Sequence, residues 1–431
     1  MNVAVLGLWH LGSVTAACLA AAGHRVVGVD FDVETIARLQ SGRAPVLEPG
    51  LDDLIAAGLA SGRLTFAASP DAVSGCDVIW VAYDTPVDDE DQADVPFVLD
   101  AVTRVLPHAM PGALVLVSSQ MPVGSIAVLE QRAAASYADR RLGFGYSPEN
   151  LRLGKALSVF QHPDRVVVGV RREADRATVT TLLAPITDRI EWMSVESAEM
   201  TKHALNAFLA TCVSFANEIA ALCEVTGADA KDVERGLKTE SRIGPGAYLG
   251  PGAAFAGGTL ARDLMFLSSL ADQHGRPARL LTAARASNDA HKQWAAARLA
   301  LEFGSVRGRR VAVWGLTYKP GTDTLRRSSA IELCRRLHGE GATVVAHDPA
   351  VPALPDDLRG WLTLASSPLE AVRGADALVV STPWPDYRTV SAADVTAALK
   401  VPCVLDASRY LASTLGAAKG LRYITVGQGA R

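Results

Sequence analysis

The chain has 431 residues, of which 49% are hydrophobic and 20% are charged, and its formal net charge is -4. This length predicts two or three domains with sizeable cores, and the composition is that of an ordinary globular protein rather than a disordered one. The small net charge, with no block of like charge, argues against nucleic acid or an anionic membrane as the main partner.

The N-terminal residues MNVAVLG read as a strand and show no signal-peptide pattern. Apolar runs are interrupted by Gly, Asp or His before the ~20 residues that a membrane span needs. The six cysteines are scattered without CxxC pairs, so we expect reduced thiols and neither a disulfide framework nor a zinc site. These features predict a cytoplasmic protein with no membrane partner and no metal.

Residues 2–7 read as a strand, an Ala-rich stretch to about Ala22 reads as a helix, and residues 25–30 read as a second buried strand that ends in Asp30. This strand–helix–strand unit predicts a dinucleotide site. The N–H groups at the start of the helix would receive the pyrophosphate, and the Asp30 carboxylate would accept hydrogen bonds from the adenosine ribose. A carboxylate there would repel a 2′-phosphate, which favours NAD over NADP.

The glycine pattern GxGxxG is incomplete in this unit. Gly7 and Gly12 occupy its first and third positions, and Trp9 replaces the second glycine, which normally lets the pyrophosphate approach the backbone. A strand–helix–strand unit packed without any ligand stays an alternative.

Further strands are predicted within residues 77–86, 113–124, 141–151 and 164–170, with helices between them. This alternation predicts a doubly wound, mostly parallel sheet whose ligands bind beyond the carboxyl ends of the strands. Polar residues next to a proline lie at the carboxyl ends of three of these strands. Such residues are typical either of a ligand-binding site or of an ordinary turn. They are Asp84-Thr85-Pro86, Ser119-Gln120-Met121-Pro122 and Ser147-Pro148-Glu149.

A long helix is predicted from Ser197 to about Thr226. Lys202 and Asn206 are four residues apart and share one face, where they could stabilise an alkoxide in a cleft or lie exposed to solvent. Apolar residues cover more than one side of this helix, which predicts either a central position in the domain or a subunit interface.

A glycine-containing loop at 255–263 precedes another helix and includes Thr259 and Asp263. A second nucleotide-binding-like half begins with residues 309–323 and repeats the order strand, glycine turn, helix, without a glycine fingerprint. Lys319, Asp323 and Arg326 follow its first strand, where they would suit phosphates and ribose.

Together these segments resemble the UDP-glucose/GDP-mannose dehydrogenase family over nearly the whole chain. The motifs that carry the resemblance, in chain order, are GLWHLG with VVGVDFD, APVLEPGLDDL (44–54), SPENLRLGKAL (147–157), KHALNAFLATCVSFANEIA (202–220), the loop before Asp263, GLTYKPGTDTLR (315–326) and STPWPDY (381–387). The resemblance implies two Rossmann-like domains joined by a long central helix. It divides the chain into an NAD domain at 1–195, a central helical dimerisation and active-site region at 196–304, and a nucleotide-sugar domain at 305–431.

The resemblance also implies the ligands and the site residues. NAD is the expected cofactor, a nucleotide-diphosphate sugar is the expected substrate, and a homodimer through the central helix is the expected assembly. The expected catalytic residues are Lys202, Asn206, Asp263, Glu149 and Thr259. The expected cofactor-binding residues are Gly7, Trp9, His10, Leu11, Gly12, Asp30, Thr85, Pro86 and Gln120. The expected substrate-binding residues are Glu149, Asn150, Leu151, Lys202, Asn206, Tyr248, Gly257, Lys319 and Arg326.

The departures from the family pattern concern the chemistry. The family oxidises a sugar alcohol twice through a cysteine thioester, and counting from Pro251-Gly252 places Thr259 at the position of that cysteine. Arg262 stands where the family has a lysine, Leu153 where it has the second glutamate of SPEFLREG, and Gln120 where it has a threonine. A threonine hydroxyl is almost fully protonated near neutral pH and cannot replace a thiolate.

We therefore expect an NAD-dependent nucleotide-sugar oxidoreductase that lacks the thioester step and performs two-electron chemistry. Three alternatives stay open: a redox-neutral epimerase with bound NAD, a conventional four-electron dehydrogenase, and a non-catalytic homologue that binds the sugar nucleotide. A 6-phosphogluconate-type or 3-hydroxyacid dehydrogenase is disfavoured, because residues 309–431 add a second Rossmann-like domain.

Overall fold

The computed structural model describes the whole chain except residues 87, 89–92, 150, 257 and 430–431. The chain forms two compact units, Met1–Ala204 and Leu205–Arg431. The division falls inside one long helix, α8 (Val195–Thr226). The domain boundaries expected from the sequence stay a prediction.

The first unit contains an eight-stranded sheet in the order β3-β2-β1-β4-β5-β6-β7-β8. Neighbouring strands are parallel except for β6 and β7, which pair antiparallel. The strands are β1 (Asn2–Leu6), β2 (Arg25–Val29), β3 (Leu64–Ala67), β4 (Val78–Val81), β5 (Leu114–Val117), β6 (Gly143–Tyr146), β7 (Val166–Val170) and β8 (Ile190–Met193). The central strands are apolar and buried on both faces, as expected for a parallel sheet covered by helices.

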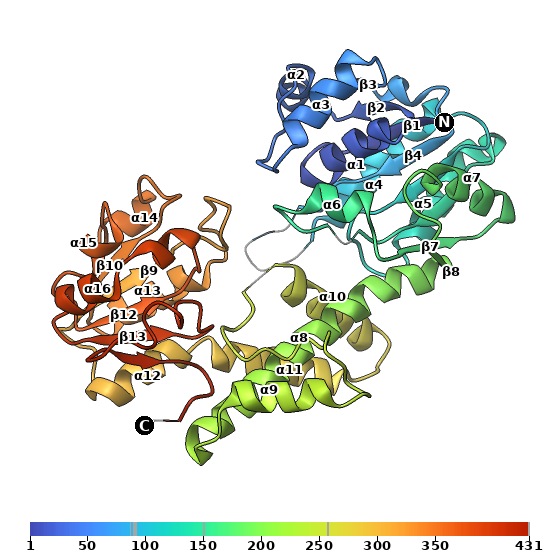
Figure 1. Cartoon of the computed structure of the whole chain (residues 1–431). Coiled ribbons are helices and arrows are strands. Elements are labelled where there is room, and N and C mark those ends of the chain that lie inside the picture. The colour runs from blue at the N-terminus through green and yellow to red at the C-terminus, as the bar shows by residue number, and fades with distance from the viewer. Residues whose placement is uncertain (87, 89–92, 150, 257, 430–431) are drawn as a thin grey trace. The chain divides into compact units, whose positions relative to one another are not determined.

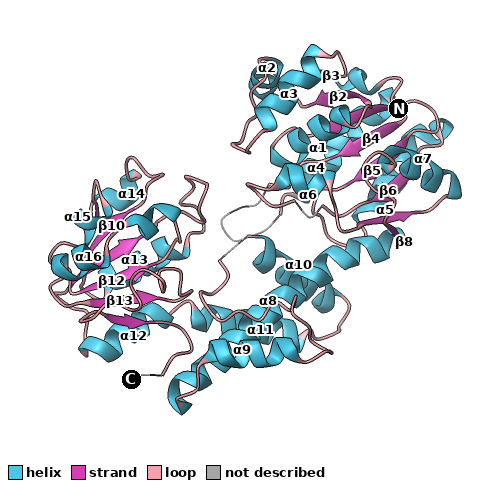
Figure 2. Cartoon of the chain, in the orientation of Figure 1, coloured by secondary structure: helices cyan, strands magenta, loops and turns pink. Residues whose placement is uncertain are grey.

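Helices cover both faces of this sheet (Figure 2). They are α1 (His10–Ala21), α2 (Val33–Gln40), α3 (Leu51–Ala60), α4 (Val95–Val105), α5 (Ser125–Tyr137), α6 (Ala156–Gln161) and α7 (Glu173–Leu183). Side chains of α1, α3, α6 and α7 share one core, whereas those of α4 and α5 share the other. Helix α1 is rich in small residues and is buried along most of its length, so its N-terminus is held close to the end of β1.

The second unit contains a group of helices and a six-stranded parallel sheet in the order β11-β10-β9-β12-β13-β14 (Figure 1). Its strands are β9 (Arg310–Trp314), β10 (Thr343–His347), β11 (Leu362–Leu364), β12 (Ala377–Val380), β13 (Cys403–Asp406) and β14 (Arg422–Ile424). Besides α8, its helices are α9 (Ala230–Thr239), α10 (Thr259–Gln273), α11 (Arg279–His291), α12 (Trp294–Phe303), α13 (Ser329–Gly339), α14 (Asp356–Arg359), α15 (Pro368–Val372) and α16 (Ala392–Ala398). The predicted fold class, two Rossmann-like parallel-sheet domains joined by a long central helix, is confirmed.

By length and mean hydropathy alone, helix α8 is long and apolar enough to cross a membrane, and a third of its most apolar stretch is buried. The expectation from the sequence considered uninterrupted apolar runs, whereas mean hydropathy tolerates isolated polar residues. A long helix in the core of a globular protein meets the same criterion. Three buried side chains of α8 make polar contacts: Lys202 contacts Glu149, Asn206 contacts Asp263, and the amide oxygen of Asn217 accepts the N–H of Gly252.

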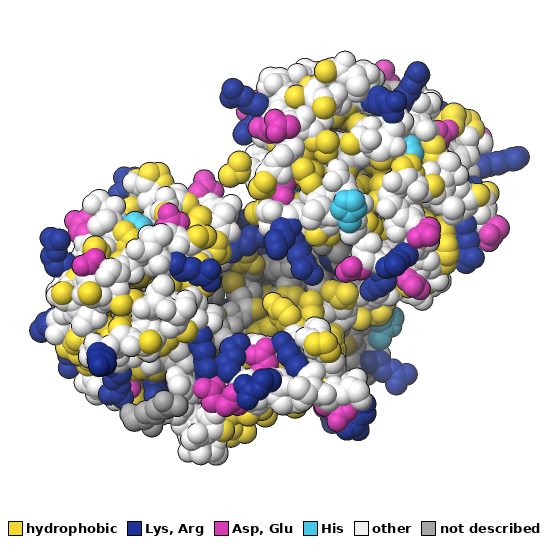
Figure 3. Space-filling view, in the orientation of Figure 1, with side chains coloured by type: hydrophobic (Ala, Val, Ile, Leu, Met, Phe, Trp, Pro, Cys, Tyr) yellow, Lys and Arg dark blue, Asp and Glu magenta, His cyan; other side chains and the backbone are white. Residues whose placement is uncertain are grey.

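On the face shown in Figure 3, Lys and Arg side chains are interleaved with Asp, Glu and hydrophobic side chains. The helix and sheet surfaces seen there carry both signs of charge. That arrangement is typical of a solvated protein surface and gives no support to a nucleic-acid site on this face.

Candidate active site

The backbone requires glycine at two of the three positions of the glycine pattern, which lies between β1 and α1. Gly7 has a φ of +89°, and a Cβ on it would lie 2.6 Å from the ring of Tyr83. A Cβ on Gly12 would lie 1.6 Å from the carbonyl oxygen of Gly7. Trp9, at the second position, has a φ of -73° and a side chain that is 53% exposed. The loop therefore keeps its shape without the second glycine, and the substitution places an indole on its outer surface.

Asp30 follows β2, and both oxygens of its carboxylate hold backbone groups. Oδ2 accepts the N–H of Leu8 at 2.7 Å, and Oδ1 accepts the N–H of Asp32 at 3.0 Å. The carboxylate is thus fixed beside the glycine loop, where it can still accept a ribose hydroxyl with its remaining lone pairs. The loop, the start of α1 and Asp30 together fit a dinucleotide that has an unmodified 2′-hydroxyl.

His10, the first residue of α1, is held by a residue that the sequence analysis did not single out. Its Nε2 lies 2.9 Å from Oε2 of Glu48, a buried carboxylate. Glu48 also accepts the N–H groups of Gly154 at 2.8 Å and Ala156 at 2.9 Å. Glu48 therefore ties the glycine loop to the segment that follows Glu149. Its place in the motif LEPG was the only sequence signal for it.

Thr85 and Gln120 are brought together, but through the backbone of Gln120. The buried Thr85 hydroxyl donates to the carbonyl oxygen of Gln120 at 2.7 Å and so links the loops that follow β4 and β5. Pro86 is exposed beside them. These three predicted cofactor-binding residues lie at the carboxyl ends of neighbouring strands, as the strand order requires.

In the first unit, Lys202 and Glu149 form a buried ion pair. The Lys202 Nζ lies 3.2 Å from Oε1 of Glu149 and 2.5 Å from its carbonyl oxygen, and the Lys202 side chain is 6% exposed. The other Glu149 oxygen accepts the N–H of Leu151 at 2.8 Å. The buried Glu199 carboxylate accepts the N–H groups of Gly124 and Ile126 and so anchors the start of α8 to α5. Lys202 is thus a fixed cation whose direction is set by its helix.

In the second unit, the Asn206 amide donates through Nδ2 to Oδ2 of Asp263, and both side chains are buried. Asn206 lies one helical turn after Lys202 on α8, so the helix presents the cation and the amide on one face. Asp263 lies in the first turn and a half of α10. The structure therefore brings together two residues that the sequence analysis named as catalytic candidates; their catalytic roles stay a prediction.

Thr259 is the first residue of α10, and it is exposed. Gly258 before it has φ +105° and ψ -139°, a conformation that residues with a Cβ rarely adopt. A Cβ on Gly258 would lie 3.0 Å from the hydroxyl oxygen of Tyr318, so the loop accommodates the phenol because this glycine has no side chain. A cysteine at a helix N-terminus would have a lowered pKa, whereas a threonine hydroxyl does not ionise there.

The six cysteines are free thiols, and five of them are buried. Burial raises the pKa of Cys18 and Cys334 to about 12 and that of Cys76 and Cys403 to about 11. Burial also raises the pKa of Cys212 and Cys223. In the described part of the chain, no group of His, Cys, Asp and Glu side chains could hold a metal ion.

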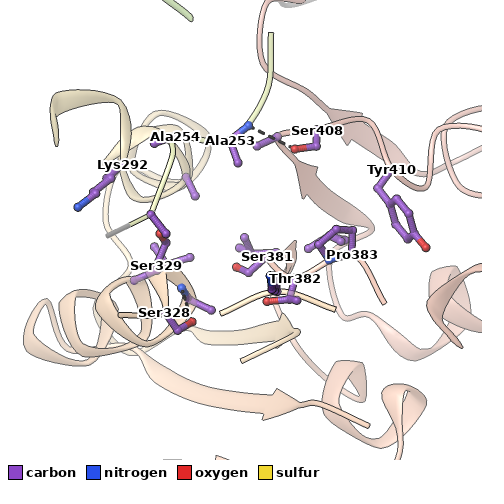
Figure 4. A pocket seen from close by; sticks show the side chains of 18 of the residues that line it. Ala253, Ala254, Lys292, Ser328, Ser329, Ser381, Thr382, Pro383, Ser408 and Tyr410 are labelled. Atoms are coloured by element: carbon purple, nitrogen blue, oxygen red, sulfur yellow. Dashed lines mark hydrogen bonds between the residues drawn. The ribbon is translucent and has the colours of Figure 1, made fainter. Parts of the chain in front are cut away.

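A cavity of about 540 Å³ lies in the second unit, at the carboxyl ends of β9, β12 and β13. Hydroxyl groups from three segments surround it, and Figure 4 shows Ser329, Ser381, Thr382 and Ser408 around the same space. Ser329 is the first residue of α13, and its buried hydroxyl has no hydrogen-bond partner among the described residues. A helix N-terminus beside an unsatisfied hydroxyl suits a ligand with phosphate oxygens.

The second sheet does not repeat the dinucleotide site of the first. Gly315 directly follows β9, but the next helix, α13, begins only at Ser329. Asp348 Oδ2 accepts the N–H groups of Leu316 and Thr317, at 2.7 Å and 2.9 Å. The segment between Gly315 and Ser329 instead contributes Tyr318 and Lys319 to the cavity wall.

Some predicted substrate-binding residues line this cavity and others do not. Lys319 and Tyr248 are among its lining residues. Arg326 is exposed and is not part of the described lining. Asn150 and Gly257 lie outside the described residues. Sequence reasoning did not name the hydroxyl-bearing residues of the cavity wall, which are Ser328, Ser329, Ser381, Thr382 and Ser408. Two of them, Ser381 and Thr382, belong to the motif STPW that was part of the family resemblance.

Three family models match the chain in order. They are described as the NAD binding domain (residues 1–187), the central domain (196–290) and the UDP binding domain (312–413) of the UDP-glucose/GDP-mannose dehydrogenase family. A UDP-glucose 6-dehydrogenase of Pseudomonas aeruginosa is 35% identical, with 99% of this chain and 98% of that protein covered. A UDP-glucose 6-dehydrogenase of Rhizobium meliloti is 34% identical over 99% of this chain and 100% of its own.

Solved structures show the same likeness. A UDP-glucose dehydrogenase of Pyrobaculum islandicum matches with a TM-score of 0.88 and 31% identity, covering 99% of this chain and 98% of its own. A UDP-D-ManNAc dehydrogenase of Pyrococcus horikoshii matches with a TM-score of 0.85 and 25% identity, covering 99% of both chains. The similarity therefore extends over both units and the helix that joins them.

Proposed function

The chain belongs to the UDP-glucose/GDP-mannose dehydrogenase family and uses NAD, and from that premise we propose that it oxidises a nucleotide-diphosphate sugar by two electrons, without a thioester step. The observation that carries this proposal is Thr259 at the N-terminus of α10. Counting along the sequence from Pro251-Gly252 assigns this residue to the position of the family's cysteine. Leu153 supports it, because the residue associated with thioester hydrolysis has no carboxylate here.

NAD supplies the acceptor for the two electrons and the hydrogen of the sugar carbon when it is bound. The residues of the chain act on the remaining proton and on the charge of the alcohol oxygen. Lys202 is a buried cation that stabilises the developing alkoxide, and the Asn206 amide adds a dipole from the same helix face. Asp263 accepts the alcohol proton through a water and passes it to solvent. The products are a carbonyl, a reduced cofactor and one proton.

A second oxidation needs a carbon that can lose another hydrogen with its electron pair. A thiolate creates such a carbon by adding to the aldehyde to give a thiohemiacetal. The Thr259 hydroxyl cannot do this at neutral pH, and the pKa values of the six thiols are all raised. The carbonyl product is therefore released without being converted to a carboxylate.

The proposed substrate is a UDP-sugar. The match of residues 312–413 to a UDP binding domain and the names of the curated relatives support this choice. The cavity beside α13, with Ser329, Lys319 and Tyr248 in its wall, supports binding of the diphosphate in the second unit. We also propose a cytoplasmic location, which the six free thiols support.

Alkylation of the native protein tests whether a thiol takes part. Treatment with iodoacetamide at neutral pH is expected to leave the oxidation rate unchanged, because five thiols are buried and a threonine does not react. The assay follows NADH production with a UDP-sugar. A Cys212→Ser variant serves as control for the one half-exposed thiol. Inactivation that substrate prevents, in both proteins, would show that a thiol does act in the site.

We further propose that the chain forms a homodimer through α8. Phe208, Phe215 and Leu222 are seven residues apart, so they form one stripe along the helix, and they are 66%, 45% and 59% exposed. Large apolar side chains in a continuous stripe mark an interaction surface more often than a solvated one. A second copy of α8 is the occupant that we propose, because a seven-residue repeat suits packing against another helix of the same spacing.

A further inference from the structure

The carboxylate of Asp84 contacts the N-terminus of α1. The Leu11 N–H, from the second residue of the helix, donates to Oδ2 of Asp84 at 3.3 Å. It belongs to the first turn, whose N–H groups have no acceptor within the helix. In a dinucleotide-binding fold these donors receive the pyrophosphate. A carboxylate of the protein therefore accepts a hydrogen bond from a group that the cofactor would use.

The backbone holds Asp84 beside this helix end. Tyr83, the preceding residue, is buried with its ring against Gly7. Thr85, the following residue, is buried and bonded to the carbonyl oxygen of Gln120. Asp84 itself is exposed to solvent between these two buried residues. Its position in the chain therefore places its negative charge near the start of α1.

Trp9 changes the same helix end in a second way. It stands where the fold normally has a glycine that lets the pyrophosphate approach the backbone. Acidic residues are absent from the first turn of α1 itself, so Asp84 supplies the carboxylate from another segment of the chain. Trp9 and Asp84 therefore both make this helix end less suited to an anion than the glycine pattern implies.

We propose that Asp84 competes with the pyrophosphate of NAD for the N-terminus of α1, so that NAD displaces the carboxylate and binds more weakly than the fold would otherwise allow. Two negative groups at one set of donors repel each other, and the repulsion is present only when the dinucleotide is bound. The proposal rests on NAD binding to the first unit. It does not depend on how many electrons the sugar loses.

The test is the affinity of Asp84→Asn for NADH, measured by calorimetry without any sugar. Asparagine keeps an oxygen that can accept the Leu11 N–H, but it removes the charge. The variant is expected to bind NADH about tenfold more tightly than the wild type at low ionic strength. The ratio of the two dissociation constants is expected to shrink toward one at about 0.5 M salt, because ions screen an exposed charge.

Ligand fragments show whether the pyrophosphate is the group concerned. ADP-ribose contains the pyrophosphate and is expected to gain as much affinity as NADH. Adenosine lacks it and is expected to bind both proteins equally. Asp53→Asn on α3 is the matched control, since it removes an equally exposed carboxylate of the same unit. Asp84→Ser, with a small neutral side chain, is a second variant in case the asparagine disturbs folding.

Unchanged or weaker NADH binding by folded Asp84→Asn and Asp84→Ser would overturn the proposal. A gain that extended to adenosine would do the same, because it would place the effect on the nucleoside. A gain of similar size in Asp53→Asn would show a general effect of net charge. Melting curves of the three variants establish that each is folded before the affinities are compared.

Discussion

Lys202→Met is expected to lower kcat by about a thousandfold, because it removes the buried cation that we propose stabilises the developing alkoxide. The Lys202 Nζ is fixed by the side chain and the carbonyl oxygen of Glu149. Methionine has a similar length and can fill the same space without the charge. The Michaelis constant for the sugar is expected to change much less, since the interaction strengthens only as charge develops. Steady-state NADH production measures both parameters.

A structural role for Lys202 would give a different result. Removal of the lysine leaves the Glu149 carboxylate without its cation in a partly buried position, which destabilises the fold. The double variant Lys202→Met/Glu149→Gln is therefore expected to recover thermal stability while kcat stays low. Lys400→Met, which changes an exposed lysine paired with Asp376, is the control. Recovery of kcat together with stability in the double variant would contradict a catalytic role for the cation.

Phe215→Glu is expected to convert the proposed dimer to monomers, with a dissociation constant raised at least about a hundredfold. Phe215 lies at the centre of the stripe formed with Phe208 and Leu222, so its replacement buries a carboxylate against the partner helix. Sedimentation velocity over a series of protein concentrations measures the change.

Val33→Glu provides the matched control for this substitution. Val33 is an exposed apolar residue on α2 in the first unit, whereas the stripe belongs to the second unit. It is expected to leave the sedimentation coefficient unchanged. A wild-type protein that sediments as a monomer at all concentrations, or a Phe215→Glu variant that stays dimeric, would contradict an interface on α8.

The parts of the fold that depend on local pattern were predictable from the sequence. The strands at 2–7 and 25–30 alternate with an Ala-rich helix, and the structure has β1, α1 and β2 there. Asp30 was identifiable because the end of the second strand defines its place in such a unit. Lys202 and Asn206 were identifiable as a pair because helical spacing alone puts them on one face.

Contacts between distant segments were not predictable in the same way. Asp84 and Leu11 are 73 residues apart in the sequence, and their hydrogen bond depends on how the loop after β4 turns. Glu48 bonds to His10, Gly154 and Ala156 because three loops converge on it. A motif recognised in one sequence gives the order of the loops along the chain. It does not give the directions in which their side chains point.

The ligand cavity of the second unit shows the same limit. Its hydroxyls come from segments after β9, β12 and β13, and each is an ordinary loop residue when it is read alone. Arg326 was expected to bind the substrate because of its place in the loop after the first strand of this half and because of the family resemblance, yet it lies outside the described lining. The assignment of Thr259 to the family's cysteine position is different in kind, because it needs only a count along one continuous stretch of sequence. The structure describes that stretch except at Gly257.

The number of reduced cofactors per sugar tests the central claim most directly. The purified protein is incubated with excess NAD and a limiting amount of a UDP-sugar until absorbance stops rising, and the sugar product is identified by mass. The account predicts one NADH for each sugar consumed and a product with two hydrogens fewer than the substrate, because Thr259 cannot form the thioester that a second oxidation requires. Two NADH for each sugar, with a uronate as the product, would contradict it.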